Sequence, residues 1–155
     1  MRTLICQTKI RIIQSSRLEN NMTKIEWSNN LSVGVDLIDD QHKLLIQKIA
    51  DLAEAVNKTQ GAEKILKTLG FMVEYTDFHF SAEEELMKEH DYPEMENHLK
   101  QHAQFIQMLK NLEEDFEEEG ATKALGTSIN TYLINWLIKH IQKVDVEFGA
   151  FLKTK

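Results

Sequence analysis

The sequence predicts an all-α fold: an up-down-up-down bundle of four helices preceded by an extended N-terminal arm. Apolar residues recur at spacings of three and four over four long segments, as on the buried face of an amphipathic helix. Short breaks separate these segments, and the chain has only one proline and six glycines. No stretch alternates polar and apolar residues as a strand would. Helices of similar length joined by short connections pack as antiparallel neighbours, which makes a bundle the expected architecture.

The arm is predicted for residues 23–38, TKIEWSNNLSVGVDLI, which show no helical period. Its asparagine, serine and glycine residues favour turns. We therefore expect this segment to lie extended across the bundle, with Trp27 and Val35 as its anchors.

The first two helices are marked by their ends. The first is predicted for residues 39–58, with acidic residues in its first turn that favour a helix N-terminus, and Gly61 breaks the pattern. The second spans about residues 62–89. It ends before Pro93, because the residue that precedes a proline is disfavoured in the helical region.

The last two helices are marked by glycine. The third spans about residues 94–119 and stops at Gly120, a residue that suits a helix C-terminus. The fourth spans about residues 122–152, where Gly126 and Gly149 weaken the helix near its ends.

The composition excludes several classes of protein. With 155 residues, 42% of them hydrophobic and 28% charged, the chain is typical of a globular protein. Its formal net charge of -7 repels phosphate groups, so neither nucleic acid nor an anionic membrane surface is an expected partner. No apolar run is long enough to span a bilayer, and a cytoplasmic location is expected. The single cysteine, Cys6, can form no internal disulfide.

Residues 1–21 differ from the rest of the chain, because four bases stand there against one acid. The apolar runs are too short for the core of a secretory signal. Two interpretations stay open: a transit peptide, or an extension upstream of a start at Met22. We favour the second and expect residues 1–21 to be disordered or not native, with a single folded domain over residues 22–155.

Five of the six histidines fall on the predicted apolar faces of four different helices. Two carboxylates accompany them, each four or five residues after a histidine. Residues four apart lie on one stripe of a helix, so each such pair can reach one metal ion. One pair alone is a weak signal, but five buried imidazoles would each need a separate partner. The predicted metal ligands are His42, His79, Glu83, His98, His102, His140 and Asp145.

This donor set favours iron. It contains no cysteine, which argues against a structural zinc site. Imidazoles and carboxylates suit iron, and four-helix bundles gather such side chains into di-iron centres. Seven ligands are too many for one ion and suit two. By contrast, His90, Glu84 and Glu85 fall outside the set and are expected to face solvent.

The spacing between His140 and Asp145 fits a regular helix poorly. Five residues turn a side chain ~140° away from the same face. Either the two side chains reach the metals from different flanks, or a π-type turn brings them to one side. The sequence leaves both alternatives open.

These motifs resemble those of the hemerythrin family, and closely those of its single-domain bacterial members, the bacteriohemerythrins. The resemblance rests on DDQHKL at 39–44, HFSAEE at 79–84, HLKQH at 98–102 and WLIKHIQKVD at 136–145. It extends over residues 22–152, and the predicted arm also resembles the start of the family's domain.

The resemblance implies a cofactor of two iron ions, Fe2+/Fe3+, joined by a bridging oxo or hydroxo group. It assigns His98, His102 and His140 to one iron. It assigns His42 and His79 to the other iron, while Glu83 and Asp145 bridge the pair. One coordination position then stays open on the iron that has two histidines. The candidates for an apolar oxygen pocket around it are Leu45, Phe80, Trp136, Leu137 and Ile141.

The implied function is reversible dioxygen binding, for oxygen storage or for oxygen transport to oxygen-requiring enzymes, with no enzymatic activity of its own. Three alternatives stay open: a di-iron oxidase or peroxidase, a nitric oxide-handling protein, and a module that senses oxygen or iron. The oligomeric state is open as well. Ligating histidines donate their other ring nitrogen to an oxygen atom, and Asp39, Gln41 and Gln101 are candidate acceptors.

Overall fold

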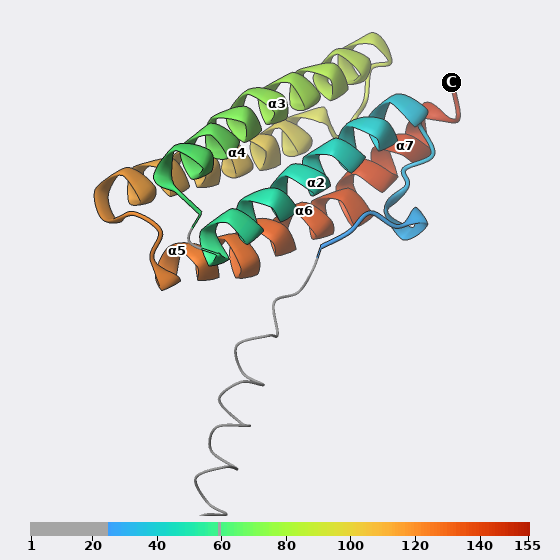
Figure 1. Cartoon of the computed structure of the whole chain (residues 1–155). Coiled ribbons are helices and arrows are strands. Elements are labelled where there is room, and N and C mark those ends of the chain that lie inside the picture. Colours follow the sequence, from blue (N-terminus) through green and yellow to red (C-terminus); the bar gives the residue numbers. More distant parts are fainter. Residues whose placement is uncertain (1–24, 59) are drawn as a thin grey trace, which may run out of the picture.

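The computed structural model of the chain describes residues 25–58 and 60–155. The predicted extension over residues 1–21 lies outside the described residues. Within them all regular structure is helical, and four long helical rods pack side by side (Figure 1). This confirms the predicted four-helix bundle. The first three rods are α2 (Asp36–Asn57), α3 (Ala62–Glu89) and α4 (Met95–Glu119).

The fourth rod is one continuous helix whose hydrogen-bond pattern changes along its length. Three α-helical stretches alternate with two π-helical ones. In the π-helical stretches a backbone N–H donates to the carbonyl five residues earlier instead of four. The segments are α5 (Lys123–Thr127), η2 (Ser128–Leu133), α6 (Ile134–His140), η3 (Ile141–Asp145) and α7 (Val146–Leu152).

The first helix begins earlier than predicted. α2 starts at Asp36, so the assignment of residues 36–38 to the arm was wrong. The Asp39 N–H already donates to the carbonyl of Val35 at 2.9 Å, and Ile38 is buried one turn before His42. The apolar stripe therefore extends one turn further toward the N-terminus than the acidic pair 39–40 suggested.

The arm is held to the bundle at its C-terminal part. It contains a short 3-10 turn, η1 (Asn29–Leu31), and its deeply buried residues are Leu31 and Val33, while the predicted anchors Trp27 and Val35 are only partly buried. A Cβ atom on Gly149 would lie 2.3 Å from the Val33 carbonyl oxygen. Gly149 thus allows the arm to lie directly against α7.

The loop between α3 and α4 is closed by local contacts. Asp91 adopts a left-handed backbone conformation with φ of 52°, and the Tyr92 N–H donates back to the Met87 carbonyl at 2.9 Å. The Tyr92 ring lies 4.9 Å from the rings of both Phe148 and Phe151. This end of the bundle is therefore packed, and it fixes the start of α4, where the first predicted ligand of that helix stands.

No helix within the described residues is both long and apolar enough to cross a membrane. The buried apolar core runs along the whole bundle, and the buried charged and histidine side chains interrupt it nearer the end where α2 and α4 begin. Burial of so many ionisable groups is costly unless each finds a partner.

Candidate metal centre

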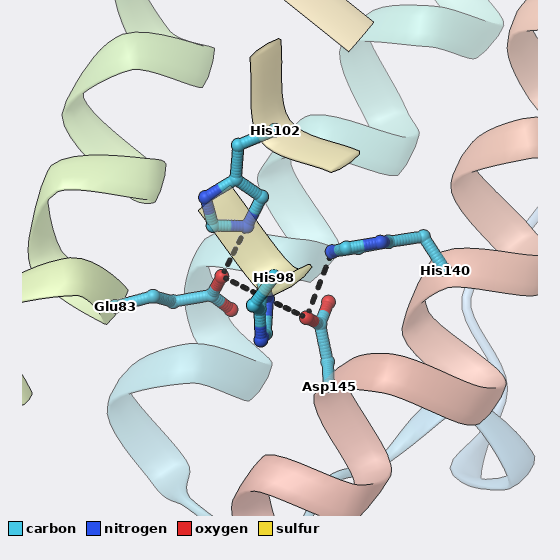
Figure 2. A group of neighbouring side chains, drawn as sticks. All are labelled: Glu83, His98, His102, His140 and Asp145. Atoms are coloured by element: carbon cyan, nitrogen blue, oxygen red, sulfur yellow. Dashed lines mark ion pairs between the residues drawn. The ribbon is translucent and has the colours of Figure 1, made fainter. Parts of the chain in front are cut away.

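All seven predicted ligand side chains meet in the interior of the bundle. They come from α2, α3, α4 and the fourth rod, and none exposes more than 3% of its surface. Figure 2 shows five of them turned toward one another from three rods. Their role as metal ligands stays a prediction, but their convergence gives it a geometry.

The side chains form two groups that share both carboxylates. In one, the ligand atoms of Glu83, His98, His102, His140 and Asp145 all lie within 4.8 Å of one another. In the other, the same holds for His42, His79, Glu83 and Asp145. The shared carboxylates make the arrangement one site with two halves.

Glu83 divides its two oxygen atoms between the halves. Its Oε1 lies 3.3 Å from His79 Nε2 and 3.6 Å from His42 Nε2. Its Oε2 lies 3.1 Å from His102 Nε2 and 3.5 Å from His98 Nε2. A carboxylate placed in this way can bind one ion with each oxygen.

Asp145 does the same from the opposite rod. Its Oδ2 lies 3.1 Å from His42 Nε2, while its Oδ1 lies 3.0 Å from the Nε2 atoms of His98 and His140. Each half of the site therefore receives one oxygen atom from each of the two carboxylates.

A π turn brings His140 and Asp145 to the same side of the fourth rod. The π-helical segment η3 (Ile141–Asp145) lies between them, and five residues make about one turn of a π-helix. This settles the alternative left open by the sequence. The extra residue in the turn lets α6 and α7 keep their apolar faces on the core while both side chains point inward.

The arrangement of the donor atoms suits coordination of metal ions better than hydrogen bonding among the side chains. Within the described part of the chain, no hydrogen bond satisfies either oxygen of Glu83 or Asp145, or the Nε2 atoms of His42, His98, His102 and His140. Two atoms that bind one ion at about 2.1 Å and at right angles lie about 3.0 Å apart. The observed nitrogen–oxygen distances start at that separation and extend to 3.6 Å, and buried polar atoms are rarely left without a partner.

Comparison with known proteins agrees with this geometry. Residues 33–152 match the family described as the hemerythrin HHE cation binding domain. The chain belongs to the hemerythrin family. It is 31% identical to a bacteriohemerythrin from Stenotrophomonas maltophilia (strain R551-3) over 132 residues, which are 85% of this chain and 84% of that protein. It is 28% identical to a myohemerythrin from Theromyzon tessulatum over 127 residues, 82% of this chain and 92% of that one.

A solved structure shares the fold. The crystal structure of a wild-type hemerythrin superposes with a TM-score of 0.73 and 26% sequence identity, and the match covers 84% of this chain and 98% of that chain. Hemerythrins bind a di-iron centre, and the buried histidine and carboxylate cluster of this chain is able to hold metal.

Hydrogen bonds to glutamine side chains outside the ligand set orient two of the histidines. With Nε2 turned to the centre, the Nδ1–H of His79 donates to Gln41 Oε1 at 2.7 Å, and that of His140 donates to Gln101 Oε1 at 3.0 Å. Such partners fix the ring orientation and make the ligand nitrogen more basic. The prediction for Gln41 and Gln101 agrees with these contacts.

Two neighbouring acids were misplaced by the sequence analysis. Asp39 does not reach a ligand histidine. Its carboxylate accepts hydrogen bonds from the Val33 N–H at 2.8 Å and the Ser32 hydroxyl at 2.5 Å, so it ties the arm to α2. Glu84, expected to face solvent, instead lies 3.4 Å from His102 Nδ1. Of the other side chains expected to face solvent, Glu85 is exposed and His90 is half-buried.

The predicted oxygen-pocket residues fall into two groups. Leu45, Leu137 and Ile141 are buried with at most 1% of their surface exposed, and Phe80 stacks flat on His102 with ring centroids 3.6 Å apart. Trp136 is half-buried and stacks on His140 at 4.6 Å. It also borders a surface cavity of about 290 Å³ beside His98 and His140, which places it on the three-histidine half.

The carboxylates control the charge of the histidines in the metal-free protein. Burial lowers the pKa of His42 and His98, but the neighbouring carboxylates of Asp145 and Glu83 outweigh it and raise each pKa to about 9. Burial dominates at His79 and lowers its pKa to about 4. Burial favours the neutral acids as well, yet the surrounding histidines hold the pKa of Glu83 and of Asp145 well below its ordinary value.

Metal binding is therefore expected to release protons. At neutral pH His42 and His98 carry a proton that the metal must displace, whereas His79 is already neutral. Affinity for a divalent ion such as Co2+ is expected to rise between about pH 6 and pH 9, about tenfold per pH unit for each proton released. Calorimetric titration of the metal-free protein at several pH values measures the affinity. Repeating it in buffers of different ionisation enthalpy measures the number of protons released. An affinity that does not change over this range would contradict the assignment.

Proposed function

We propose that this hemerythrin binds dioxygen reversibly at a di-iron centre, for oxygen storage or for delivery to oxygen-requiring enzymes, and is not an enzyme. The observation that carries the proposal is the division of both Glu83 and Asp145 between two groups of histidines. Two iron ions, which change between the ferrous and ferric states, supply the electrons that reversible dioxygen binding requires. The side chains of this chain determine where a ligand can approach and what surrounds it.

The two halves of the site differ by one nitrogen. His98, His102 and His140 serve one half, whereas only His42 and His79 serve the other. Since both halves receive one oxygen from each carboxylate, the half with two histidines keeps room for a small external ligand. Dioxygen is such a ligand.

Apolar side chains around the ligands keep water away. Leu45 stands one turn after His42, and Leu137 and Ile141 flank His140 on the fourth rod, all of them buried. Exclusion of water and of the protons that it carries protects the reduced centre from oxidation. This supports reversible binding in place of turnover.

The composition of the donor set supports the same conclusion. Five neutral imidazoles and two carboxylates stabilise high-valent iron less than the carboxylate-rich sets of di-iron oxygenases do. The relatives named bacteriohemerythrin and myohemerythrin are consistent with it. We also propose that residues 22–155 form the oxygen-binding domain and that it acts in the cytoplasm.

The test is a visible absorption spectrum of the iron-loaded protein. The protein is reduced without oxygen, exposed to oxygen and then flushed with argon. We expect a band that appears with oxygen and fades under argon, and we expect the same cycle in a His90→Ala variant, which lacks only the histidine outside the site. Immediate oxidation with steady consumption of a reductant would favour an oxidase or peroxidase instead.

A further inference from the structure

Thr76, on α3, is a fully buried side chain whose hydroxyl has no partner. Ten polar or charged side chains are buried among the described residues, and seven of them are the predicted ligands. Asp39 and Gln41 also have partners, since they bind the arm and the His79 ring. Thr76 is the tenth, with 0% of its surface exposed, and its Oγ1 makes no hydrogen bond within the described residues. A buried polar atom without a partner is uncommon and requires a physical explanation.

A threonine inside a helix commonly bonds to the backbone of its own helix. Thr68 does so on α3 itself, where its hydroxyl donates to the Lys64 carbonyl at 2.9 Å. Thr127 does so on the fourth rod, where its hydroxyl donates to the Lys123 carbonyl at 3.0 Å. The Thr76 hydroxyl makes no such bond in the part of the chain that the structure describes. It is therefore free to donate to a group inside the bundle.

Thr76 belongs to the layer of side chains that lies next to the ligand histidines. Successive rods run in opposite directions (Figure 1), so this layer consists of residues that follow a ligand on α2 and α4 and precede one on α3 and the fourth rod. Its four members each stand three residues from a ligand histidine and expose at most 1% of their surface: Leu45, Thr76, Phe105 and Leu137. Leu45 and Leu137 belong to the predicted wall of the oxygen pocket. Thr76 thus places one hydroxyl in an otherwise apolar layer.

Within this layer, Thr76 stands beside the half of the centre that has two histidines. It precedes His79 by three residues and Phe80 by four, and side chains at these spacings are neighbours on a helix. The side chain of a helical residue leans over the preceding turn, so the His79 ring leans toward Thr76. The rings of His79 and His42 lie 4.7 Å apart. The half that keeps room for an external ligand therefore has the Thr76 hydroxyl next to it.

The surrounding layer offers this hydroxyl no acceptor. His79, the nearest ligand on α3, is already engaged, because its Nδ1–H donates to Gln41 Oε1 at 2.7 Å and its Nε2 faces Glu83 Oε1 at 3.3 Å. The other three members of the layer are apolar. An ordered water needs about two to four polar partners, and the layer supplies only the hydroxyl of Thr76. A molecule that enters the site can supply the missing acceptor.

We propose that Thr76 is a ligand-binding residue of the site and that its hydroxyl donates a hydrogen bond to the outer end of a small ligand held at the two-histidine half. For dioxygen as the ligand, this inference rests on the proposed function. Hydrogen bonds to an acceptor that carries negative charge are stronger than those between neutral groups. The hydroxyl therefore favours small ligands whose outer atom is electron-rich, and the apolar members of the layer keep out water.

The first test is the affinity of the oxidised, iron-loaded protein for azide, measured by spectrophotometric titration. Azide is a linear anion that binds ferric iron by one end and keeps an acceptor at the other. Thr76→Val replaces the hydroxyl by a methyl group of similar size and is expected to raise the dissociation constant about tenfold. Thr76→Ser keeps the donor and is expected to stay within about twofold of the natural chain.

The matched control is Thr68→Val. It makes the same change on the same helix, at a hydroxyl that bonds to the backbone of α3. Neither threonine is a predicted ligand, so each variant is expected to keep its iron, and iron analysis verifies this. Azide affinity is expected to be unchanged in Thr68→Val.

The second test needs no iron. A buried hydroxyl without a partner opposes folding, so Thr76→Val is expected to leave the urea midpoint of the metal-free protein unchanged or to raise it. If an ordered water or another part of the fold bonded to the hydroxyl, valine would leave that partner unsatisfied and the midpoint would fall. Circular dichroism measures unfolding of the natural chain and of both Thr76 variants.

Two results would overturn the proposal: an unchanged azide affinity in iron-loaded Thr76→Val, and a lower urea midpoint of this variant without metal. Both are independent of the proposed function, because azide binding needs only a ferric centre. Failure of the proposed function has a different sign, an absorption band that does not fade under argon in the natural chain. If the natural chain does release oxygen, Thr76→Val is expected to release it about tenfold faster, and an equal rate would also overturn the proposal.

Discussion

Replacement of Glu83 by alanine is expected to remove iron from the protein and to abolish oxygen binding. Glu83 is fully buried and supplies one carboxylate oxygen to each half of the site. Its loss removes one donor from both ions at once, so iron content is expected to fall from about two ions per chain to about one or fewer. Iron analysis and the visible spectrum after oxygen exposure measure the two effects.

A matched control separates this effect from loss of negative charge on α3. Glu85 stands two residues further along the same helix and is exposed, so Glu85→Ala is expected to keep its iron and its spectrum. Glu83→Gln tests the bridging role at almost constant volume, because the amide offers only one oxygen where the carboxylate offers two. Full iron content with normal oxygen binding in Glu83→Ala would remove Glu83 from the ligand set.

The sequence could reveal the ligand set because its signal lies in spacings along single helices. His79 with Glu83 and His98 with His102 are four residues apart, and helix geometry alone puts each pair on one stripe. The same geometry showed that the five-residue spacing from His140 to Asp145 does not fit a regular helix, and it left two explanations for that spacing. The other π-helical segment, Ser128–Leu133, contains no pair of candidate ligands with an irregular spacing, so nothing in the sequence pointed to it.

What the sequence could not supply are contacts between helices. Glu84 was expected in solvent because it turns ~100° away from Glu83. Its long side chain nevertheless reaches toward α4 and meets His102, an interaction that depends on how α3 packs on α4. Asp39 was expected near a ligand for the opposite reason. It is close to His42 in sequence, but the arm folds back over it, and the Val33 N–H and the Ser32 hydroxyl each donate to one of its two oxygens.

For the apolar wall of the oxygen site, too, the sequence could not predict which single residues reach the interior. The sequence, through its resemblance to the hemerythrin family, offered five apolar residues as candidates for this wall, and all five lie on helices that carry ligands. It could not separate Trp136, which reaches a surface cavity, from Leu137 beside it, which is 1% exposed. Neighbours in sequence on a helix point ~100° apart, so one can line an interior while the other meets solvent.

Leu137→Ala is expected to speed oxidation of the reduced protein by air. Leu137 is buried three residues before His140 on the same rod, so its truncation leaves a cavity beside the ligands. Water can then approach the site, and the rate of autoxidation is expected to rise about tenfold or more. The same truncation is expected to cost about 2–5 kcal/mol of unfolding free energy, as for other buried leucines. Absorption spectra recorded over time under air measure the rate of autoxidation, and thermal unfolding measures the loss of stability.

Loss of stability alone could also admit water, through more frequent local opening of the bundle. Leu133→Ala separates the two causes, because Leu133 is as deeply buried one turn earlier on the same rod and its truncation costs a similar amount of stability. If Leu137 is part of the wall, oxidation is faster in Leu137→Ala than in Leu133→Ala although both unfold at similar temperatures. If the two variants oxidise at the same rate, the apolar core protects the iron by holding the bundle closed, and Leu137 has no special place in the wall.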